Sequence, residues 1–258
     1  RHLGNSVQKS YEEIERLMKE IVEQQNERRK SELAVLQSQI NPHFLYNTLE
    51  SITWMIEGNR NQDAVFMISE LAQLFRISLS RGKTIIRIGD ELQHCRNYMN
   101  IQKYRYRERF VTEYDVSEEI YPFCTVKLIL QPILENAIYY GVGDMDEDDH
   151  PRILVRGFKK DEDIYLMVSD NGMGMRREDV ENILTDNQKV PKHGSGVGLI
   201  NVHTRIQLMF GAGYGLAVES EPDEGTTVTI HLPAIPYTKE NCELLETPGK
   251  PSRNEGEA

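Results

Sequence analysis

Cysteine is scarce in this sequence. Its three cysteines, Cys95, Cys124 and Cys242, are odd in number and widely separated among 258 residues. This spacing excludes a disulfide framework and matches no metal-ligand pattern, and it favours a reducing compartment. No apolar run approaches the roughly 20 residues that a membrane-spanning helix needs, and no signal peptide opens the chain. The chain begins inside a helical pattern, which suits a portion of a longer protein.

Positive charge is also in short supply. Lys and Arg number 30 against 41 Asp and Glu, giving a formal net charge of -11. This balance argues against a protein that binds nucleic acid or an anionic membrane. The length suggests one or two domains with enough chain for a real hydrophobic core.

Residues 1–40 predict a coiled-coil signalling helix. The stretch is rich in Glu, Lys, Arg and Gln, and its apolar positions follow the 4-3-4-3 spacing of a coiled-coil seam. A single solvated helix is the alternative, but it would leave this seam exposed, so we favour a parallel dimer. After a slip of one residue, which resembles a stutter, the seam returns. Its positions are Val7, Tyr11, Ile14, Met18 and Ile21, then Leu33, Leu36 and Ile40.

A histidine lies directly after a proline at the start of a helix predicted over residues 43–57. At about 100° per residue, His43 falls opposite the apolar stripe, on the solvent face with Asn47 and Glu50. Pro42 removes one helical hydrogen bond and allows a kink. Taken alone, His43 would be an ordinary surface histidine. The stripe consists of Leu45, Leu49, Ile52 and Ile56.

A second amphipathic helix is expected over about 62–80. Together, residues 41–89 predict a helical-hairpin dimerisation domain, half of a four-helix bundle that a second chain completes. A short extended link at 84–88 follows, and Asp90 is expected to cap a third helix over about 91–108. The apolar face of the second helix contains Val65, Ile68, Leu71, Ala72, Phe75 and Leu79.

From Phe110 onward the hydrophobic period changes between that of strands and that of helices. Helices on one face of a mixed, mainly antiparallel sheet are expected, so the fold class is α+β and the domain extends over 90–236 with its connecting helix. The polar tail at 237–258 is expected to be disordered. The predicted strands are 110–116, 152–159, 163–169, 214–221 and 226–232, and the predicted helices are 125–140 and 198–210.

Two segments of this domain carry the oxygen ligands and turns of a nucleotide site. Glu135 and Asn136 place a carboxylate beside a carboxamide oxygen on a helix, and Mg²⁺ prefers such hard ligands. Asp170 ends a strand and is followed by Gly172 and Gly174. A carboxylate there can accept a hydrogen bond from the amino group of a nucleotide base, while the glycines let the backbone approach the ligand closely.

Two further segments complete the pattern. Gly194, Gly196 and Gly198 open a helix, where backbone N–H groups favour phosphate oxygens. Their spacing is neither the dinucleotide fingerprint nor a P-loop. Thr226 adds a hydroxyl on a strand near a turn.

In this order, the four segments resemble the GHKL (Bergerat) ATP-binding fold, an α/β sandwich shared by DNA gyrase, MutL repair proteins, heat-shock chaperone ATPases and histidine kinases. The resemblance covers about 110–233. It implies that Asn136 binds Mg²⁺ and that Asp170 binds the adenine amino group with support from Thr226. It also implies that the glycines at 194, 196 and 198 close over the phosphates. The ATP-binding residues that it implies are Glu135, Asn136, Asp170, Gly172, Gly174, Gly194, Gly196, Gly198, Leu199, Asn201, Arg205 and Thr226.

The sequence Asn-Pro-His-Phe-Leu-Tyr-Asn at 41–47 resembles the phosphoacceptor motif of LytS/YesM-type sensor histidine kinases. Residues 88–92 and 98–105 also resemble that family's connecting region. The resemblance implies a homodimeric, Mg-ATP-dependent kinase that phosphorylates His43 and passes the phosphoryl group to an aspartate of a response regulator. It further implies a membrane anchor upstream of this chain and a location on the cytoplasmic side of the membrane.

The residues around His43 suit this chemistry. A neutral imidazole is a competent nucleophile near pH 7, and a hinge around 82–90 would let the ATP domain reach it. Glu50 is a candidate to take or orient the imidazole proton. Asn47 either positions a water for dephosphorylating the regulator or makes a local hydrogen bond.

One departure from the family pattern leaves two other functions open. Tyr139 and Tyr140 stand where the family often has Lys-His, and Lys192, His193 and Arg205 are candidates to replace the lost charge. The first alternative is a weakly active nucleotide-binding scaffold, or a phosphatase acting on the regulator. The second is an ATP-driven clamp of the gyrase or chaperone type, for whose transducer domain the short tail leaves no room.

Overall fold

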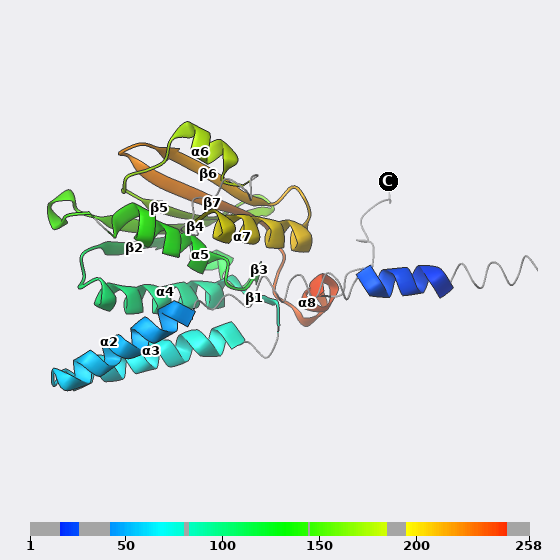
Figure 1. Ribbon diagram of the computed structural model, residues 1–258. Helices are drawn as coiled ribbons and strands as arrows, with labels where there is room; N and C mark the ends of the chain where they lie inside the picture. Colours follow the sequence, from blue (N-terminus) through cyan, green and yellow to red (C-terminus); the bar gives the residue numbers. More distant parts are fainter. Residues whose placement is uncertain (1–15, 26–41, 80–82, 144, 185–194, 247–258) are drawn as a thin grey trace, which may run out of the picture. The chain divides into compact units, whose positions relative to one another are not determined.

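The computed structural model describes residues 16–25, 42–79, 83–143, 145–184 and 195–246 (Figure 1). The chain divides into two units, one formed by Arg1–Ile40 with Thr247–Ala258 and the other by Asn41–Glu246. In the first unit, residues 16–25 are helical, and Met18 and Ile21 are exposed. The other predicted seam positions lie outside the described residues, so the coiled coil stays a prediction.

The second unit begins with a helical hairpin, α2 (Pro42–Glu57) and α3 (Asn61–Leu79). Pro42 is the first residue of α2, a position where its missing N–H costs no helical hydrogen bond. The hairpin turns at Gly58-Asn59, where Asn59 has a φ of 57°. Both predicted helices are therefore confirmed, with bounds shifted by about one residue. The predicted kink at Pro42 would lie between α2 and the preceding residues, which are outside the described part of the chain, so it stays a prediction.

The third predicted helix, α4 (Ile88–Arg105), begins earlier than expected. The residue preceding its first turn is Arg87, in extended backbone with φ -73° and ψ 146°, so the expectation that Asp90 caps this helix is wrong. The reason is that strand β1 (Ile85–Arg87) runs directly into the helix. Asp90 instead lies in the first turn, where its charge complements the helix dipole.

The helix predicted over 125–140 is only partly present. Strand β3 (Cys124–Val126) replaces its beginning and pairs antiparallel with β1, opposing Thr125 to Ile86. Helix α5 (Leu130–Asn136) follows and continues into a π-helix (Ala137–Val142). The β1–β3 pairing joins segments far apart in the sequence, so local periodicity could not reveal it.

The large sheet has five strands in the order β2-β4-β5-β7-β6. Strand β2 is parallel to β4, and the other neighbours are antiparallel, which confirms the α+β class with a mixed, mainly antiparallel sheet. Helix α7 (Ser195–Phe210) contacts β6 and β7, and the short α6 (Arg177–Asn182) contacts β6. The strands are β2 (Val111–Val116), β4 (Arg152–Lys160), β5 (Asp163–Asp170), β6 (Gly215–Glu221) and β7 (Gly225–Pro233).

Helix α4 lies between the hairpin and the layer formed by α5 and α7, and this layer covers the sheet (Figure 1). One hydrophobic core runs through all these layers. It includes Phe44 and Leu74 of the hairpin, Tyr98 of α4, Ile133 of α5 and Leu166 of the sheet. The α2–α3 hairpin and the domain that contains the five-stranded sheet therefore pack as one unit in this structure.

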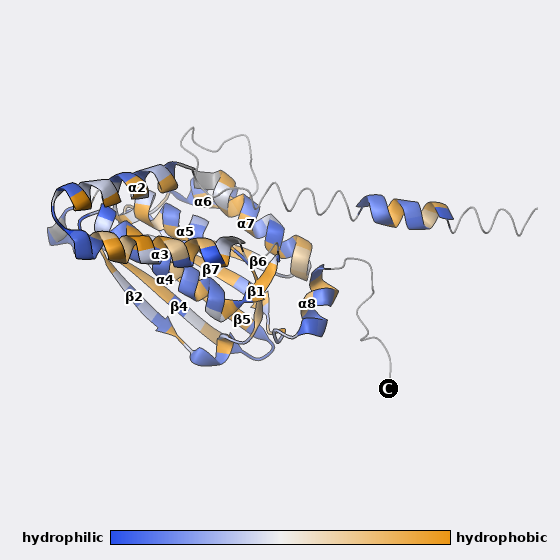
Figure 2. Cartoon of the chain, turned by 90° about the horizontal axis from the view of Figure 1, so that it is seen from below, coloured by the Kyte–Doolittle hydropathy of each residue, from blue (hydrophilic) through white to orange (hydrophobic). Residues whose placement is uncertain are grey.

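The hairpin also keeps large apolar side chains exposed. Hydrophobic and hydrophilic residues alternate along α2 and α3 in Figure 2. Ile52 of the predicted stripe is buried, whereas Leu49 and Ile56 are 47% and 53% exposed. Single helical hairpins with such a face are stabilised by burying it against a partner. The exposed residues are Tyr46, Leu49, Trp54, Ile56, Val65, Phe66 and Ile68.

The tail is not wholly without structure. Residues 239–246 form helix α8 (Lys239–Glu246), so the expected disorder is wrong for this part of 237–258. The Glu246 Oε1 atom accepts the backbone N–H groups of Thr84 at 2.9 Å and Ile85 at 3.1 Å. These contacts join distant segments, which composition alone cannot predict. Within the described parts of the chain, no helix is long and apolar enough to cross a membrane.

Candidate phosphotransfer site

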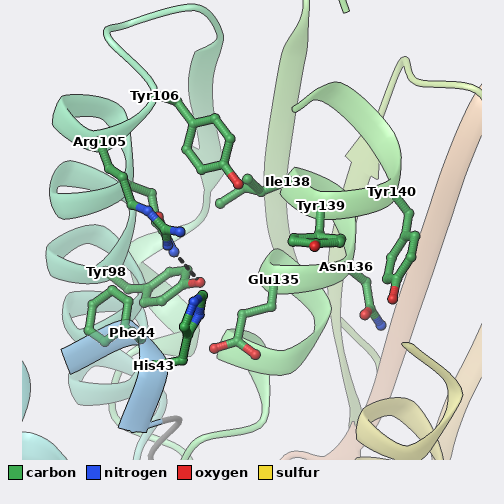
Figure 3. Close-up of a pocket in the computed structure, with 11 residues that line it drawn as sticks. His43, Phe44, Tyr98, Arg105, Tyr106, Glu135, Asn136, Ile138, Tyr139 and Tyr140 are labelled. Carbon is green, nitrogen blue, oxygen red and sulfur yellow. Dashed lines mark hydrogen bonds between the residues drawn. The ribbon is translucent and has the colours of Figure 1, made fainter. Parts of the chain in front are cut away.

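A pocket of about 270 Å³ lies where the start of α2, the end of α4 and the α5–π-helix segment meet (Figure 3). It brings together His43 with Glu135 and Asn136, which are more than 90 residues apart in the sequence. The pocket is lined by His43, Phe44, Tyr98, Gln102, Arg105, Tyr106, Glu135, Asn136, Ile138, Tyr139 and Tyr140.

His43 is an exposed residue in the first turn of α2, as the sequence predicted. The amide nitrogen of Asn47 lies 3.2 Å from both ring nitrogens of His43. It can donate to whichever ring nitrogen carries no proton. Of the two readings of Asn47, the geometry shows the local hydrogen bond. Glu50 is exposed and is not among the residues that line the pocket.

The neighbouring Phe44 explains why His43 faces the ATP-binding half. Phe44 is only 2% exposed, and its ring centroid lies 5.1 Å from that of Tyr98 on α4. The Tyr98 hydroxyl in turn accepts a hydrogen bond of 2.5 Å from Gln102 Nε2. Because consecutive helical residues point about 100° apart, anchoring Phe44 in this aromatic contact sets the direction of His43.

The carboxylate that shares the pocket with His43 belongs to Glu135 (Figure 3). Gln131 Nε2 donates a hydrogen bond of 2.8 Å to Glu135 Oε1. Burial raises the pKa of Glu135, and hydrogen bonds from Gln131 and Tyr98 oppose this rise. A carboxylate with a raised pKa is a stronger base than an exposed one. The sequence assigned Glu135 to ATP binding and did not show that it lies beside His43.

Asn136 is the last residue of α5 and lines the same pocket. A carboxamide oxygen next to a carboxylate fits Mg²⁺, which takes one or two protein ligands and fills its other positions with phosphate and water. No group of three or more His, Cys, Asp or Glu side chains able to hold a metal occurs among the described residues. One carboxamide and one carboxylate oxygen suit a metal that also binds the phosphates of a nucleotide.

Asp170 ends β5, as predicted, and lies directly opposite Thr226 of β7. The Gly172 N–H donates a hydrogen bond of 3.0 Å to Asp170 Oδ1. Burial raises the pKa of Asp170 to about 6, although the backbone N–H groups of Gly172 and Thr226 favour its charged form. The Thr226 hydroxyl lies 2.9 Å from that of Ser220. A desolvated carboxylate of this kind is a strong acceptor of a hydrogen bond from an amino group.

Glycines keep side chains away from this carboxylate. A Cβ atom on Gly141 would lie 2.7 Å from Asp170 Oδ1, and one on Gly172 would lie 2.3 Å from the Gly141 Cα. Gly174 has a φ of 62°, and a Cβ there would lie 1.9 Å from the Glu221 carbonyl oxygen. Gly141 belongs to the π-helix, a form often found at functional sites. The sequence identified Gly172 and Gly174 but missed Gly141.

The predicted phosphate segment is described only in part. Gly194 lies outside the described residues, whereas Gly196 and Gly198 are in the first turn of α7. A Cβ on Gly198 would lie 3.4 Å from the Pro132 Cβ, so α7 and α5 are close here. Leu199 is 2% exposed and belongs to the core, and Asn201 is half-buried. Leu199 therefore packs in the hydrophobic core and does not line the pocket.

Arg205 differs from its predicted role. It is 2% exposed, and it donates hydrogen bonds to the carbonyl oxygens of Leu128, at 3.2 Å, and Lys127. Its guanidinium is thus directed into the protein, away from the pocket lining. Lys192 and His193 lie outside the described residues. The arginine that does line the pocket is Arg105, which the sequence showed only as part of the family-like segment 98–105.

Family models match two regions of this chain. Residues 31–110 match the histidine kinase model, and residues 125–236 match the model for histidine kinase-, DNA gyrase B- and HSP90-like ATPases. His43 lies in the first match, and Glu135, Asn136, Asp170 and Thr226 lie in the second.

Curated relatives show the same similarity across the two regions. The sensor histidine kinase YesM of Bacillus subtilis (strain 168) is 39% identical over 220 residues, covering 85% of this chain and 36% of that protein. The sensor protein LytS of Streptococcus mutans is 30% identical over 220 residues, covering 83% of this chain and 36% of that protein. The chain thus spans about a third of the length of these relatives.

Among solved structures, the histidine kinase domain of the blue-light activated kinase EL346 of Erythrobacter litoralis is 16% identical. The match covers 88% of this chain and 100% of that domain, with a TM-score of 0.45.

Proposed function

Because the chain belongs to the sensor histidine kinases of the LytS/YesM type, we propose that it transfers the γ-phosphoryl group of Mg-ATP to His43. The phosphoryl group then passes to an aspartate on the receiver domain of a response regulator. The observation that carries this proposal is the pocket shared by His43, Glu135 and Asn136. It places an exposed imidazole beside the residues suited to a nucleotide's metal and phosphates.

In the transfer step, the unprotonated ring nitrogen of His43 attacks the γ-phosphorus. A nitrogen–phosphorus bond forms while the bond to the β–γ bridging oxygen breaks, and ADP leaves. Glu135 accepts the proton that the imidazole releases, a role that its raised pKa suits. The Asn47 amide orients the ring before transfer, and its hydrogen bond to the unprotonated nitrogen breaks as that nitrogen attacks. Mg²⁺ bound through Asn136 would supply charge neutralisation at the phosphates.

The nucleotide's base lies at Asp170 in this proposal. The carboxylate accepts a hydrogen bond from the adenine amino group, and Gly141 and Gly172 keep side chains away from it. Thr226, on the neighbouring strand, supports Asp170 through the backbone and through water. Gly194, Gly196 and Gly198 cover the phosphates from the start of α7.

The active form in this proposal is a homodimer on the cytoplasmic side of the membrane. The exposed apolar face of α2 and α3 supports pairing of two hairpins into a four-helix bundle. The coiled-coil spacing of residues 1–40 supports a parallel arrangement upstream. An upstream membrane segment would connect the coiled coil to a stimulus.

The test uses γ-labelled ATP and Mg²⁺. Wild-type protein should acquire an acid-labile, base-stable label, His43→Ala should acquire none, and the exposed control His150→Ala should label like wild type. An unlabelled wild type would refute the kinase function. Label that persists in His43→Ala would refute the site.

A second function is favoured by the Tyr139–Tyr140 pair, whose rings lie 5.3 Å apart where a Lys-His pair would add charge. With little charge there, the protein would bind nucleotide and act mainly as a scaffold or as a phosphatase on its regulator. This function predicts rapid loss of label from a phosphorylated regulator when the kinase is added. It also predicts that His43→Ala retains part of that effect.

A further inference from the structure

Phosphoryl transfer in the pocket around His43 requires a positive charge, which the residues already assigned to the site do not supply. Phosphoryl transfer spreads negative charge over the oxygens of the moving group, and enzymes neutralise it with metal ions and with Arg or Lys side chains. On the ATP side of the pocket, the residues after Asn136 are Ile138, Tyr139 and Tyr140, which carry no positive charge. Arg205, the nearest candidate from the sequence, is buried elsewhere.

Arg105 enters the pocket from the other side. It is the last residue of α4 and is half-buried. In Figure 3 its side chain extends toward Tyr98 and His43, while Glu135 points into the same space from α5. Burial and the charge of Glu135 raise the pKa of the Tyr98 hydroxyl, and the charge of Arg105 opposes this rise.

The other contacts of Arg105 are weak. Its Cζ lies 5.7 Å from the centroid of the Tyr106 ring, near the outer limit for a cation–π contact. Within the described part of the chain, no carboxylate forms an ion pair with it. A guanidinium held in a pocket by aromatic contacts keeps its five N–H donors available for an oxyanion.

We propose that Arg105 binds the γ-phosphoryl oxygens of ATP and neutralises their charge as the group moves to His43. This inference rests on the proposed function. Arg105 would supply the positive charge that is missing where Tyr139 and Tyr140 stand in place of the family's Lys-His. Arg105 contacts the phosphoryl group in both ATP and the transition state. The nitrogen–phosphorus bond forms and the bond to ADP breaks with the guanidinium hydrogen-bonded to the transferred oxygens. It approaches from α4, opposite the Mg²⁺ site at Asn136.

The principal variants are Arg105→Met, which keeps much of the side-chain volume, and Arg105→Lys, which keeps the charge. Arg96→Met is the matched control, because Arg96 is on the same helix with its Cζ 4.8 Å from the Tyr114 ring centroid and is not among the lining residues. Three quantities are measured for each: ADP affinity, melting temperature, and the rate of phosphohistidine formation at saturating Mg-ATP.

Arg105→Met should lower the rate by about 100-fold or more, as loss of a transition-state donor does elsewhere. Its ADP affinity should stay within about twofold of wild type, because ADP lacks the γ-phosphoryl group. Arg105→Lys should be intermediate, since Lys keeps the charge without the planar pair of donors. Arg96→Met should transfer at close to the wild-type rate. Equal rates for Arg105→Met and Arg96→Met would overturn the proposal, as would losses of ADP affinity and melting temperature that account for the slower rate.

A binding measurement separates this proposal from the kinase function. In a His43→Ala background, where no transfer to that residue can occur, Arg105 should make ATP bind more tightly than ADP, and Arg105→Met should abolish the difference. If wild-type protein forms no phosphohistidine, the kinase function fails, but this ratio still decides the role of Arg105. An ATP-to-ADP affinity ratio unchanged by Arg105→Met would refute it.

Discussion

The carboxylate of Glu91 accepts the backbone N–H of Leu128 at 2.8 Å, and Leu128 has a φ of 58°. Residues other than glycine rarely adopt this left-handed conformation, and it costs energy that surrounding contacts must offset. The other Glu91 oxygen accepts the N–H groups of Ile129 at 2.8 Å and Leu130 at 2.9 Å. Glu91 therefore fixes the start of α5, the helix that carries Glu135 and Asn136.

Arg205 holds the same backbone from the other side. Its guanidinium donates to the carbonyl oxygens of Leu128 and Lys127, and burial lowers the pKa of Arg205 to about 10 while the charge of Glu91 opposes this. Helices α4, α5 and α7 are thus joined at one buried point. Arg205, which the sequence assigned to ATP binding, instead positions the start of α5.

We predict that Glu91→Gln destabilises the protein by about 3 kcal/mol, the cost of breaking a buried charged network. The amide keeps the size of the side chain but replaces one of the two accepting oxygens and leaves Arg205 without its counter-charge. Urea denaturation measures the change in the free energy of unfolding. The exposed Glu113→Gln should change it by less than about 0.5 kcal/mol. Equal stability of the two variants would contradict the anchoring role.

Nucleotide affinity should fall as the pH drops through about 6, because burial sets the pKa of Asp170 near that value. Protonation removes the charged acceptor for the adenine amino group, so affinity should be full above this pH and decline by up to about tenfold per pH unit below it. Titrations with ADP between about pH 5 and about pH 8, a range that brackets the pKa of Asp170, measure the effect. Asp170→Asn should bind weakly at every pH. A flat wild-type profile would contradict the assignment.

The same carboxyl group makes a prediction for the protein without nucleotide. Its pKa in the folded state is raised above the ordinary 3.8, so the folded protein binds the proton more tightly than the unfolded chain. Stability should therefore decline as the pH rises from about 4 to about 6 through this group. Asp170→Asn should remove that part of the decline. Denaturation curves at several pH values compare the two proteins.

Phosphoryl transfer should occur within one protomer, because Phe44 packs on Tyr98 of its own chain and directs His43 to its own Glu135. Heterodimers of His43→Ala with Asp170→Ala should then acquire no label. The first chain binds ATP but lacks the acceptor, and the second has the acceptor but binds no ATP. Differently tagged, co-expressed chains allow the heterodimer to be purified. Label on the Asp170→Ala chain would show transfer between protomers.

Charge on the exposed apolar residues of the hairpin should weaken the proposed dimer. Val65 and Ile68 are 63% and 50% exposed on α3, so glutamate at both positions should leave the single chain folded. Two buried, unpaired charges at the interface should raise the dissociation constant by about 100-fold or more. Sedimentation compares this variant with Gln62→Glu, a change at an exposed polar position of the same helix. An unaltered dimer would place the interface elsewhere.

Much of the fold could be predicted because local patterns decided it. Alternation predicted β4, β5, β6 and β7, and the apolar spacing predicted α2 and α3. The resemblance to LytS/YesM-type kinases is confirmed by the family models and by the identity to YesM. These features depend on neighbouring residues, or on motifs that are continuous in the sequence.

The parts that were missed depend on distant contacts. Strand β3 is stabilised by pairing with β1, which local periodicity does not show, and the helix predicted over 125–140 therefore included Thr125 and Val126. Arg205 was assigned to ATP binding and Arg105 was given no role of its own, for a similar reason. Both are arginines on helices, and only the packing of α4 and α7 shows which one reaches the pocket and which one is buried.

Helix α8 has a practical consequence for fragments that keep β1 but are shortened at the C-terminal end. The ATPase match ends at residue 236, so a fragment cut there would lack Glu246 and expose the N–H groups of Thr84 and Ile85. Ile85 begins β1 of the two-stranded β1–β3 sheet, and an uncovered strand edge is a template for pairing with other chains. Expression boundaries placed after residue 246 would keep this edge covered and the preparation monodisperse.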